Sequence, residues 1–279
     1  MATTFFHYPS IADAKARSTA TLRQQHNRNR QAEILQENGR GADWYGLPTF
    51  AEVNDALAHG WPEGAARIEA MAMTIEGGIR RPEGLQRRKT RADHGDALDI
   101  HSVYRGNLDK AWETSHKKLT RSTGAVKLIV DIGGNCHVDA SVLQWRGVAG
   151  AVLARAMEKA GYKVQIDAAF CSDGFDVGRN LETVFTVTVK PQATRVNVDR
   201  LAVTIGLAGF FRTVLFGCII AECDAQKAKC NTGLGHIVPV VSKLKTLDRM
   251  TTIFVPETVK DHDSAIQFCN DAIQLLRLA

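Results

Sequence analysis

A carboxylate, two glycines and an amide follow an apolar run in the stretch VKLIVDIGGN, at residues 126–135. Asp131 and Asn135 carry oxygen atoms of the kind that hard cations such as Mg²⁺ prefer. Two such side chains are few for a cation site, whereas Gly133 and Gly134 allow a tight turn without any ligand. The stretch matches neither the G-x-G-x-x-G pattern of dinucleotide sites nor the G-x-x-x-x-G-K-[ST] phosphate loop. We therefore expect a turn between a strand and a helix, with a weak cation site as the alternative.

Cysteines and histidines offer two further kinds of site. Cys218, Cys223, Cys230 and His236 have the donor atoms of a zinc site. Their spacing does not match the common structural zinc sites, and Cys218 lies in an apolar run, so core packing is favoured. A nucleophile and a base could be drawn from Cys171 and His137, but no G-x-S-x-G turn or paired-carboxylate motif occurs. We expect no cofactor, no metal and no enzymatic activity, and hydrolysis through Cys171 or His137 stays a rival hypothesis.

Positively charged residues gather in three short segments, and most of them are arginine. The densest segment has six cations within twelve residues against one acid, Glu83, and its glycines and Pro82 predict a mobile loop. Arginine favours bidentate contacts with phosphate and stacks on bases, so we expect these segments to bind a nucleic acid. The cations of the densest segment are Arg80, Arg81, Arg87, Arg88, Lys89 and Arg91.

Two other segments complete this predicted interface. One has five cations and no acid between residues 15 and 30, close to aromatic residues that would offer stacking platforms to unpaired bases. The other directly precedes the strand expected at residue 126. The residues that we expect on the binding surface from these segments are Lys15, Arg17, Arg23, Arg28, Arg30, Phe5, Phe6, Tyr8, Lys117, Lys118 and Arg121.

The first part of the chain is rich in helix and loop signals. Residues 1–41 are polar and predict a basic N-terminal arm, with a polar helix over 11–36 that would need a partner. Residues 42–125 predict a helical and loop region that includes the basic segment 80–91 and forms one compact unit with the residues that follow. Helix boundaries in this region are predicted at Thr49, Gly60 and Pro62.

Strands and helices alternate from residue 126 onward, so residues 126–279 are the predicted core. The predicted strands are 126–131, 162–170, a half-exposed strand at 182–189, and 252–255. The predicted helices are one that is capped by Asp139 or Ser141 and ended by Gly161, and those at 198–222 and 262–277. Strand–helix–strand order implies right-handed crossovers and parallel pairing. The predicted fold class is α/β: a mixed, mostly parallel sheet flanked by helices, in a Rossmann-like or von Willebrand A-like order, with a helical, basic N-terminal extension.

One segment, Leu201–Ala221, is apolar over about the length of a bilayer crossing. Arg212 lies at its centre, where a charge is costly in lipid, and glycines interrupt the run. We therefore expect two short buried helices with a bend near residues 207–210, and no membrane partner.

The composition is that of an ordinary soluble globular protein, with 44% hydrophobic residues, 23% charged residues and a formal net charge of +5. Six cysteines are too few for a disulfide scaffold, and most lie in apolar runs. The start MATTFFHYPS lacks the charged and apolar segments of a secretory signal. We expect a reducing, intracellular setting.

Four blocks of sequence resemble a family from phages and mobile elements that is defined as a domain of unknown function. They occur in order at 42–64, 99–113, 127–166 and 197–217, and the block ADWYGLPTFAEVNDALAHGWPEG is the most specific. Within that family the chain looks like the single-stranded-DNA-binding RNA polymerase cofactors of lytic podophages that carry a giant virion RNA polymerase.

That resemblance implies a viral protein of the host cytoplasm that regulates transcription. It implies binding to single-stranded DNA at melted promoters and recruitment of the phage RNA polymerase, and it leaves homo-oligomer formation open. The alternative function is a von Willebrand A-like protein-interaction module with a degenerate metal site at Asp131.

Overall fold

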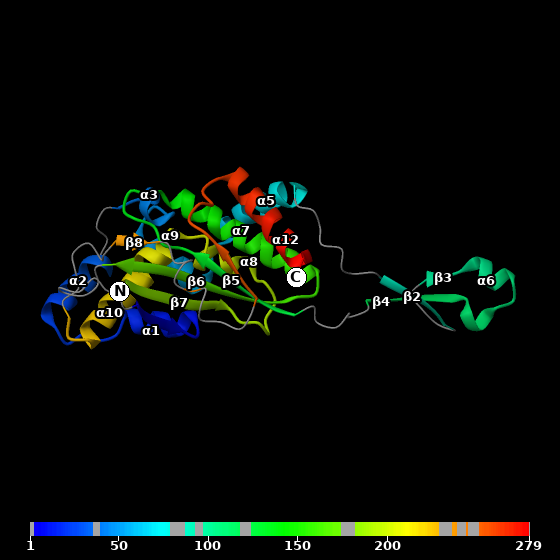
Figure 1. Ribbon diagram of the computed structural model, residues 1–279, viewed down its shortest axis with the longest axis horizontal. Coiled ribbons are helices and arrows are strands. Elements are labelled where there is room, and N and C mark those ends of the chain that lie inside the picture. Colours follow the sequence, from blue (N-terminus) through cyan, green and yellow to red (C-terminus); the bar gives the residue numbers. More distant parts are fainter. Residues whose placement is uncertain are drawn as a thin grey trace.

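The computed structural model describes residues 3–35, 40–78, 87–92, 97–117, 124–173, 182–228, 236–238, 244 and 251–278. The molecule has two parts of unequal size (Figure 1). The larger part is an α/β body, and the smaller part is a three-stranded sheet with a short helix. This small sheet stands away from the body at one end of the molecule, and none of its described elements packs extensively on the body.

The body is built on a mixed, mostly parallel sheet with the strand order β1-β7-β6-β5-β9. β5 is parallel to both β6 and β9, and β1 is parallel to β7, whereas β6 and β7 are antiparallel. Past the end of β5, the short strand β8 pairs antiparallel with the last residues of β6. The predicted α/β class, with a mixed and mostly parallel sheet flanked by helices, is confirmed. The strands are Thr3–Tyr8 (β1), Ala125–Asp131 (β5), Lys163–Asp173 (β6), Glu182–Lys190 (β7), His236–Val238 (β8) and Thr251–Val255 (β9).

The centre of the body is the strand–helix–strand unit β5–α7–β6. Val126, Leu128 and Val130 of β5 belong to the main hydrophobic core, whereas Ile129 belongs to a smaller cluster, as the alternation of a strand requires. α7 spans Ala140–Lys159, and Gly161 follows it with a left-handed φ of 94° that suits glycine. The chain then enters β6 beside β5, which is the crossover that the sequence predicts.

Helices from both ends of the chain pack around α7. α4 begins with the predicted capping box: the Thr49 hydroxyl accepts the N–H of Glu52, and the Glu52 carboxylate accepts the N–H of Thr49. Gly60 ends α4, and both α5 and α12 pack on α7. The helices of this group are Ala42–Tyr45 (α3), Phe50–His59 (α4), Pro62–Gly78 (α5) and His262–Leu278 (α12).

The apolar segment around Arg212 forms a bent series of buried helices, as predicted. Among the described residues no single helix has the length and apolarity to cross a membrane; Val198–Thr204 and Ala208–Ala225 meet those criteria only as a pair, bent by 54°. Leu201, Phe211 and Ile219 are each at most 1% exposed within the core. The successive elements are Val198–Thr204 (α8), Ala208–Phe210 (α9), the π-helical turn Phe211–Leu215 (η2) and Phe216–Ala225 (α10).

The N-terminal residues are part of the body, and the structure shows no separate basic extension. β1 extends the sheet beside β7, while α1 (Ile11–Ser18) and α2 (Gln25–Leu35) pack against α10. The predicted single helix over 11–36 is wrong, because two helices separated by a break replace it. Tyr8, Ala14 and Leu22 are almost fully buried, because the rest of the body supplies the apolar surface that these residues lack among themselves.

β7 is almost completely buried, so the prediction of a half-exposed strand is also wrong. Its alternate polar residues pair with neighbouring strands rather than with water. The Thr188 hydroxyl donates to Asp167 of β6 at 2.9 Å, and Thr186 contacts His7 of β1 at 2.9 Å. Polar alternation therefore marked hydrogen bonding across the sheet and not solvent exposure.

α2 is held to α10 by one buried carboxylate, that of Asp224. Its oxygens accept hydrogen bonds from the backbone N–H groups of Arg23 (2.7 Å) and Gln24 (2.9 Å), and from the side-chain amide of Asn27 (3.1 Å). Burial alone would raise the pKa of Asp224, but these donors outweigh burial and lower it.

Replacing Asp224 by Ala should lower the free energy of unfolding by about 2 kcal/mol at pH 7, because buried donors lose their acceptor. A carboxylate with a lowered pKa stabilises the fold at pH values above the pKa of the unfolded chain, about 3.9. This stabilisation disappears as the pH falls through the folded pKa, so the difference in stability between wild type and Asp224→Ala should shrink below about pH 4. Urea unfolding at neutral and acidic pH measures this difference, with Asp263→Ala as the control because that side chain is 97% exposed. Equal losses of stability at both pH values would contradict the role of the ionised Asp224 carboxylate as an acceptor.

Candidate nucleic-acid interface

The small sheet contains part of the cationic segment that the sequence predicts as a loop. β2 (Arg87–Ala92) pairs antiparallel with β4 (Trp112–Lys117), and β4 also pairs with β3 (Ala97–Leu98), so β4 is central. Between β3 and β4 lie the helix α6 (Ile100–Tyr104) and the turn η1 (Leu108–Lys110). The predicted mobile loop is wrong for β2, because β4 supplies hydrogen-bond partners for its backbone.

The register of β2 and β4 places four cations on one face of the small sheet. Alternate residues of a strand share a face, so Arg87, Lys89 and Arg91 lie together. Lys117 of β4 is directly opposite Arg87 and joins them. We call these four residues the cationic face. Within β2 and β4 only one acid, Glu113 opposite Arg91, shares it.

The other face of the small sheet has a different character. Trp112 is paired with Leu98 across the β3–β4 register, and Leu98 is 47% exposed. The remaining positions of this face are mostly uncharged and comprise Arg88, Thr90, Ala92, Thr114 and His116.

The outer end of the small sheet is a compact turn built around Asp99. Its carboxylate accepts hydrogen bonds from the N–H groups of His101 (3.1 Å) and Ser102 (3.4 Å) and from the Ser102 hydroxyl (2.8 Å). The Asp99 N–H donates to the carbonyl of Ala111 at 2.7 Å, and Asn107 N–H donates to the carbonyl of Ser102 at 3.0 Å. Ala111 is 1% exposed. The end of the sheet is therefore a defined structure.

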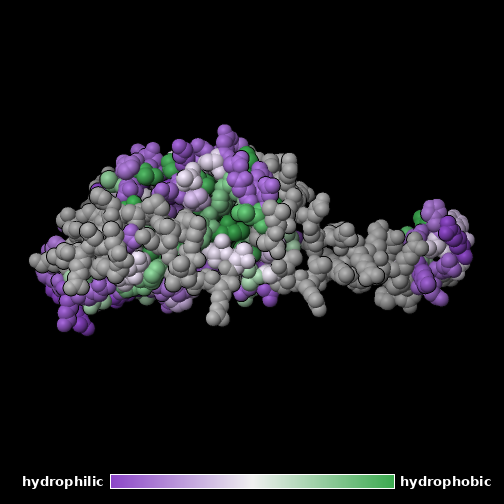
Figure 2. Space-filling model, viewed as in Figure 1, coloured by the Kyte–Doolittle hydropathy of each residue, from purple (hydrophilic) through white to green (hydrophobic). Residues whose placement is uncertain are grey.

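Large apolar side chains are exposed at this outer end. Tyr104 is 86% exposed, Ile100 58% and Leu98 47%, all within seven residues. They are three of the six large hydrophobic side chains that are exposed in the described ranges. Figure 2 shows this end as mainly hydrophilic with a small hydrophobic patch. A cluster of this kind indicates a contact surface.

The formal charge of the chain is concentrated in the segment that includes the small sheet. Residues 79–123 hold eleven of the 35 Lys and Arg residues but only six of the 30 Asp and Glu residues. Their net charge of +5 equals that of the whole chain, and the other residues balance at 24 of each sign. Four predicted site residues of this segment lie outside the described residues: Arg80, Arg81, Lys118 and Arg121.

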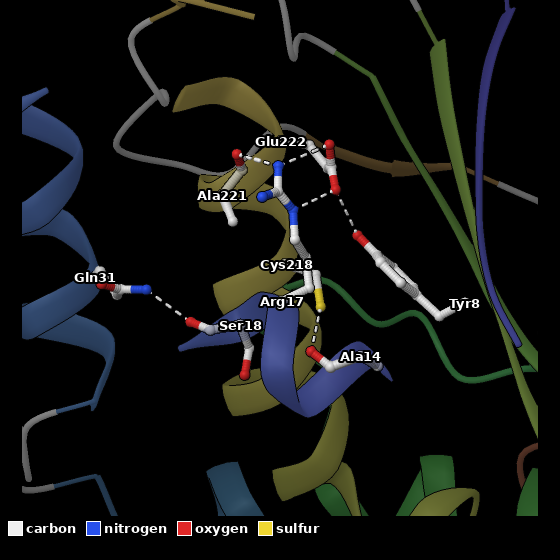
Figure 3. A network of polar contacts seen from close by, with 8 residues as sticks. All are labelled: Tyr8, Ala14, Arg17, Ser18, Gln31, Cys218, Ala221 and Glu222. Atoms are coloured by element: carbon white, nitrogen blue, oxygen red, sulfur yellow. Dashed lines mark hydrogen bonds and ion pairs between the residues drawn. The ribbon is translucent and has the colours of Figure 1, made fainter. Parts of the chain in front are cut away.

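Two of the N-terminal candidates are held in a network of polar contacts (Figure 3). Glu222 of α10 accepts hydrogen bonds from the Tyr8 hydroxyl at 3.0 Å and from Nε of Arg17 at 2.7 Å, while Arg17 also donates to the Ala221 carbonyl at 2.8 Å. Burial, with Cys218 and Glu222 nearby, raises the pKa of Tyr8, and the hydrogen bond with Glu222 raises that of Arg17. Because Tyr8 is 8% exposed and Arg17 is engaged with α10, both are left out of the proposed interface.

The other N-terminal candidates lie on the body, at the end away from the small sheet (Figure 1). Phe6 stacks on Phe185 with ring centroids 5.2 Å apart, and Phe5 is 43% exposed. Arg30 forms an ion pair with Glu33 at 2.6 Å. Lys15 is partly buried, whereas Arg23 and Arg28 are exposed. The structure thus separates the predicted 15–30 group from the cationic face.

The turn after β5 uses its polar side chains to hold the backbone. Asp131 Oδ1 accepts the N–H of Gly133 at 2.9 Å, and Asn135 Oδ1 accepts the N–H of Ile237 in β8 at 3.0 Å. The buried Arg146 donates to the Gly133 carbonyl at 2.6 Å. Within the described ranges no group of three or more His, Cys, Asp or Glu side chains is placed to hold a metal ion. The polar side chains of this turn therefore hold its backbone and connect it to β8.

A second buried arginine, Arg212, ties the same turn to α3. Its Nη2 donates to the Val138 carbonyl at 2.5 Å, its Nη1 donates to the Trp44 carbonyl at 2.5 Å, and its guanidinium lies 4.0 Å from the centroid of the Trp44 ring. Burial, and then nearby Arg40, lowers the pKa of Arg212 to about 10, so it is cationic at neutral pH.

The cysteine candidates are mainly core residues. Cys171, Cys218 and Cys223 are buried, and burial raises the pKa of Cys218 to about 12. His137 is exposed, whereas Cys171 is 0% exposed, so a substrate cannot reach that thiol in this structure. Cys230 lies outside the described residues.

The fold and the site define an α/β protein that carries a separate, cationic three-stranded sheet. A family model described as Domain of unknown function (DUF7192) matches residues 2–278, and the chain belongs to that family. No curated protein and no solved structure matches it.

Proposed function

We propose that this protein binds single-stranded DNA through the cationic face of its small sheet and acts as a phage transcription cofactor. The observation that supports DNA binding most strongly is the position of the charge. The segment with the whole formal net charge of the chain includes a sheet that stands apart from the body. Clustered arginine and lysine residues of this kind bind phosphate.

The shape of the small sheet favours an extended polyanion. The six residues of β2 cover about 20 Å, and every second residue from Arg87 to Arg91 is a cation of the cationic face. These three cations can contact successive phosphates of one strand, and Lys117 opposite Arg87 adds a fourth contact. The apolar residues on the other face and at the outer end favour unpaired DNA over a duplex, because unpaired bases expose their faces.

The transcription role rests on the resemblance to the polymerase cofactors of podophages. In this role the small sheet holds the melted promoter strand, and the body recruits the phage RNA polymerase. The separation of the two parts supports such a division, since DNA on the small sheet leaves the surface of the body accessible.

Removing cations from β2 should weaken DNA binding and its dependence on salt together. Each phosphate contact on a single strand contributes about −0.7 to the slope of log affinity against log salt concentration. Four contacts therefore predict a slope of about −3. Replacing Arg87, Arg88 and Lys89 together by Ala removes two residues of the cationic face. Affinity for a single-stranded oligonucleotide should fall about 25-fold at about 0.1 M salt, and the slope should drop to about −1.4. Fluorescence anisotropy titrations at several salt concentrations, with single-stranded and duplex DNA, measure both.

A matched control removes the same charge from the body. Replacing Lys15, Arg23 and Arg28 together by Ala should leave affinity within about twofold, because these residues lie far from the small sheet. Binding that is independent of salt, or equal losses in the two triple variants, would reject the assigned site. The same variants in transcription assays with the phage polymerase and a premelted promoter test the cofactor role, which requires stimulation that depends on β2.

A further inference from the structure

We propose that Tyr104 stacks on an unpaired base and gives the protein its preference for single-stranded over duplex DNA. This inference rests on the proposed function and adds a second kind of contact to the phosphate contacts of the cationic face. Tyr104 ends α6, which is at the outer end of the small sheet in Figure 1. At 86% exposure it is the most exposed large hydrophobic residue in the described part of the chain.

Tyr104 is carried by a turn that local hydrogen bonds hold together. A helix of five residues such as α6 is too short to be stable on its own. Asp99 caps its first turn, Gly106 reverses the chain with a left-handed φ of 76°, and the contact from Asp99 to Ala111 closes the loop. These contacts restrict the backbone that carries Tyr104, and a restricted backbone lowers the entropy cost of binding.

The charges around Tyr104 suit a nucleic acid. Arg105 follows it directly, and both Arg105 and Lys110 are exposed. This turn holds two acids, of which Asp99 accepts the hydrogen bonds that cap α6 and Asp109 is exposed. An exposed aromatic ring followed in the chain by an exposed arginine offers one group to a base and another to a phosphate.

The pairing state of the DNA decides whether this contact forms. In a duplex each base is stacked on its neighbours, so its faces are not available to a protein ring. An unpaired base offers a free face, and stacking on an aromatic side chain is tolerant of base identity. Tyr104 would therefore add affinity for single strands of any sequence and none for a duplex.

An abasic oligonucleotide separates stacking from phosphate contacts, because it keeps the backbone and lacks the bases. The intact protein should bind a thymidine oligonucleotide about tenfold more tightly than an abasic one of equal length. Tyr104→Ala should lose this advantage and bind the abasic strand as before, while Tyr104→Trp should keep it. Tyr104 is exposed, so its replacement leaves the packed core unchanged. Met73→Ala, at a residue of α5 that is 72% exposed, is the matched control.

The outcomes distinguish this inference from the function on which it rests. If Tyr104→Ala binds the thymidine oligonucleotide as tightly as the intact protein does, the inference is overturned, and the outer end is then a surface for a protein partner. An equal loss on thymidine and abasic strands also overturns it, because the residue would then act through the backbone. If the intact protein binds neither strand, the proposed function itself fails.

Discussion

Replacing Arg212 by Met is expected to lower the free energy of unfolding by about 3 kcal/mol. The side chain is 2% exposed, and its two terminal nitrogens donate to the carbonyls of Trp44 and Val138. Methionine fills much of the space but donates nothing, so these carbonyls lose their donors. Methionine carries no charge, so the variant avoids the free-energy cost of desolvating the guanidinium. The expected loss is therefore smaller than that of breaking a buried ion pair.

Two further variants separate charge from geometry at this position. Arg212→Lys keeps the charge but cannot reach both carbonyls with a planar fork, so it should lose nearly as much stability as Arg212→Met. Arg195→Met removes an exposed arginine of the body and should change stability by less than about 0.5 kcal/mol. Chemical unfolding followed by circular dichroism measures all three. Wild-type stability in Arg212→Met would show that the turn after β5 does not need this arginine.

Replacing Gly147 by Ala should also cost about 3 kcal/mol, although alanine favours a helix over glycine by about 1 kcal/mol. A Cβ atom at this position of α7 would lie 2.3 Å from the carbonyl oxygen of Ile205 and 2.8 Å from the Cα of Gly206. Both are backbone atoms in the turn between α8 and α9. α7 would have to move away from that turn, which disturbs the packing on both sides of the helix.

The neighbouring Gly150 is the matched control, because it lies in the same helix. A Cβ atom there would meet a methyl group of Val130 at 2.8 Å, and the nearest contacts are otherwise side-chain atoms. Side chains adjust more easily than backbone, so Gly150→Ala should cost less than about 1 kcal/mol. Thermal and urea unfolding of the two variants give the comparison. A larger loss for Gly150→Ala than for Gly147→Ala would contradict the assigned contact.

The sequence predicts the core of the fold well, because its signals there are local. The apolar run of β5, the helical spacing of α7 and the capping box at Thr49 each specify an element and its boundaries from neighbouring residues. The bend near residues 207–210 also follows from local features, namely Arg212 and the glycines. Patterns of this kind need no information about distant partners.

The strands that the sequence analysis missed depend on partners far along the chain. β1 has a short, mixed sequence, and it is a strand because β7 is beside it. β2 contains four cations in six residues, which favours a solvated loop until β4 pairs with it. The exposure of Tyr8 was overestimated for the same reason, since Glu222 and α10 cover it.

The sequence identifies part of the candidate interface and does not single out Tyr104. Charge clustering directed attention to Arg87, Lys89 and Arg91, and the β2–β4 register now places them on one face with Lys117. Tyr104 was not among the predicted residues. Its sequence context offered a signal, because an aromatic residue before Arg105 and a glycine turn lay between two basic segments.

The parallel pairing of β1 with β7 has a consequence for a chain that is still being synthesised. Thr3 pairs with Glu182, so β1 leaves the ribosome well before β7 and has no place in the sheet until β7 has also emerged. At about 5–20 residues per second, that delay is on the order of ten seconds or more. Throughout this interval TTFFHY carries neither a formal charge nor a proline to discourage pairing with a foreign strand. The β1 edge of the sheet therefore forms only after β7 has been synthesised.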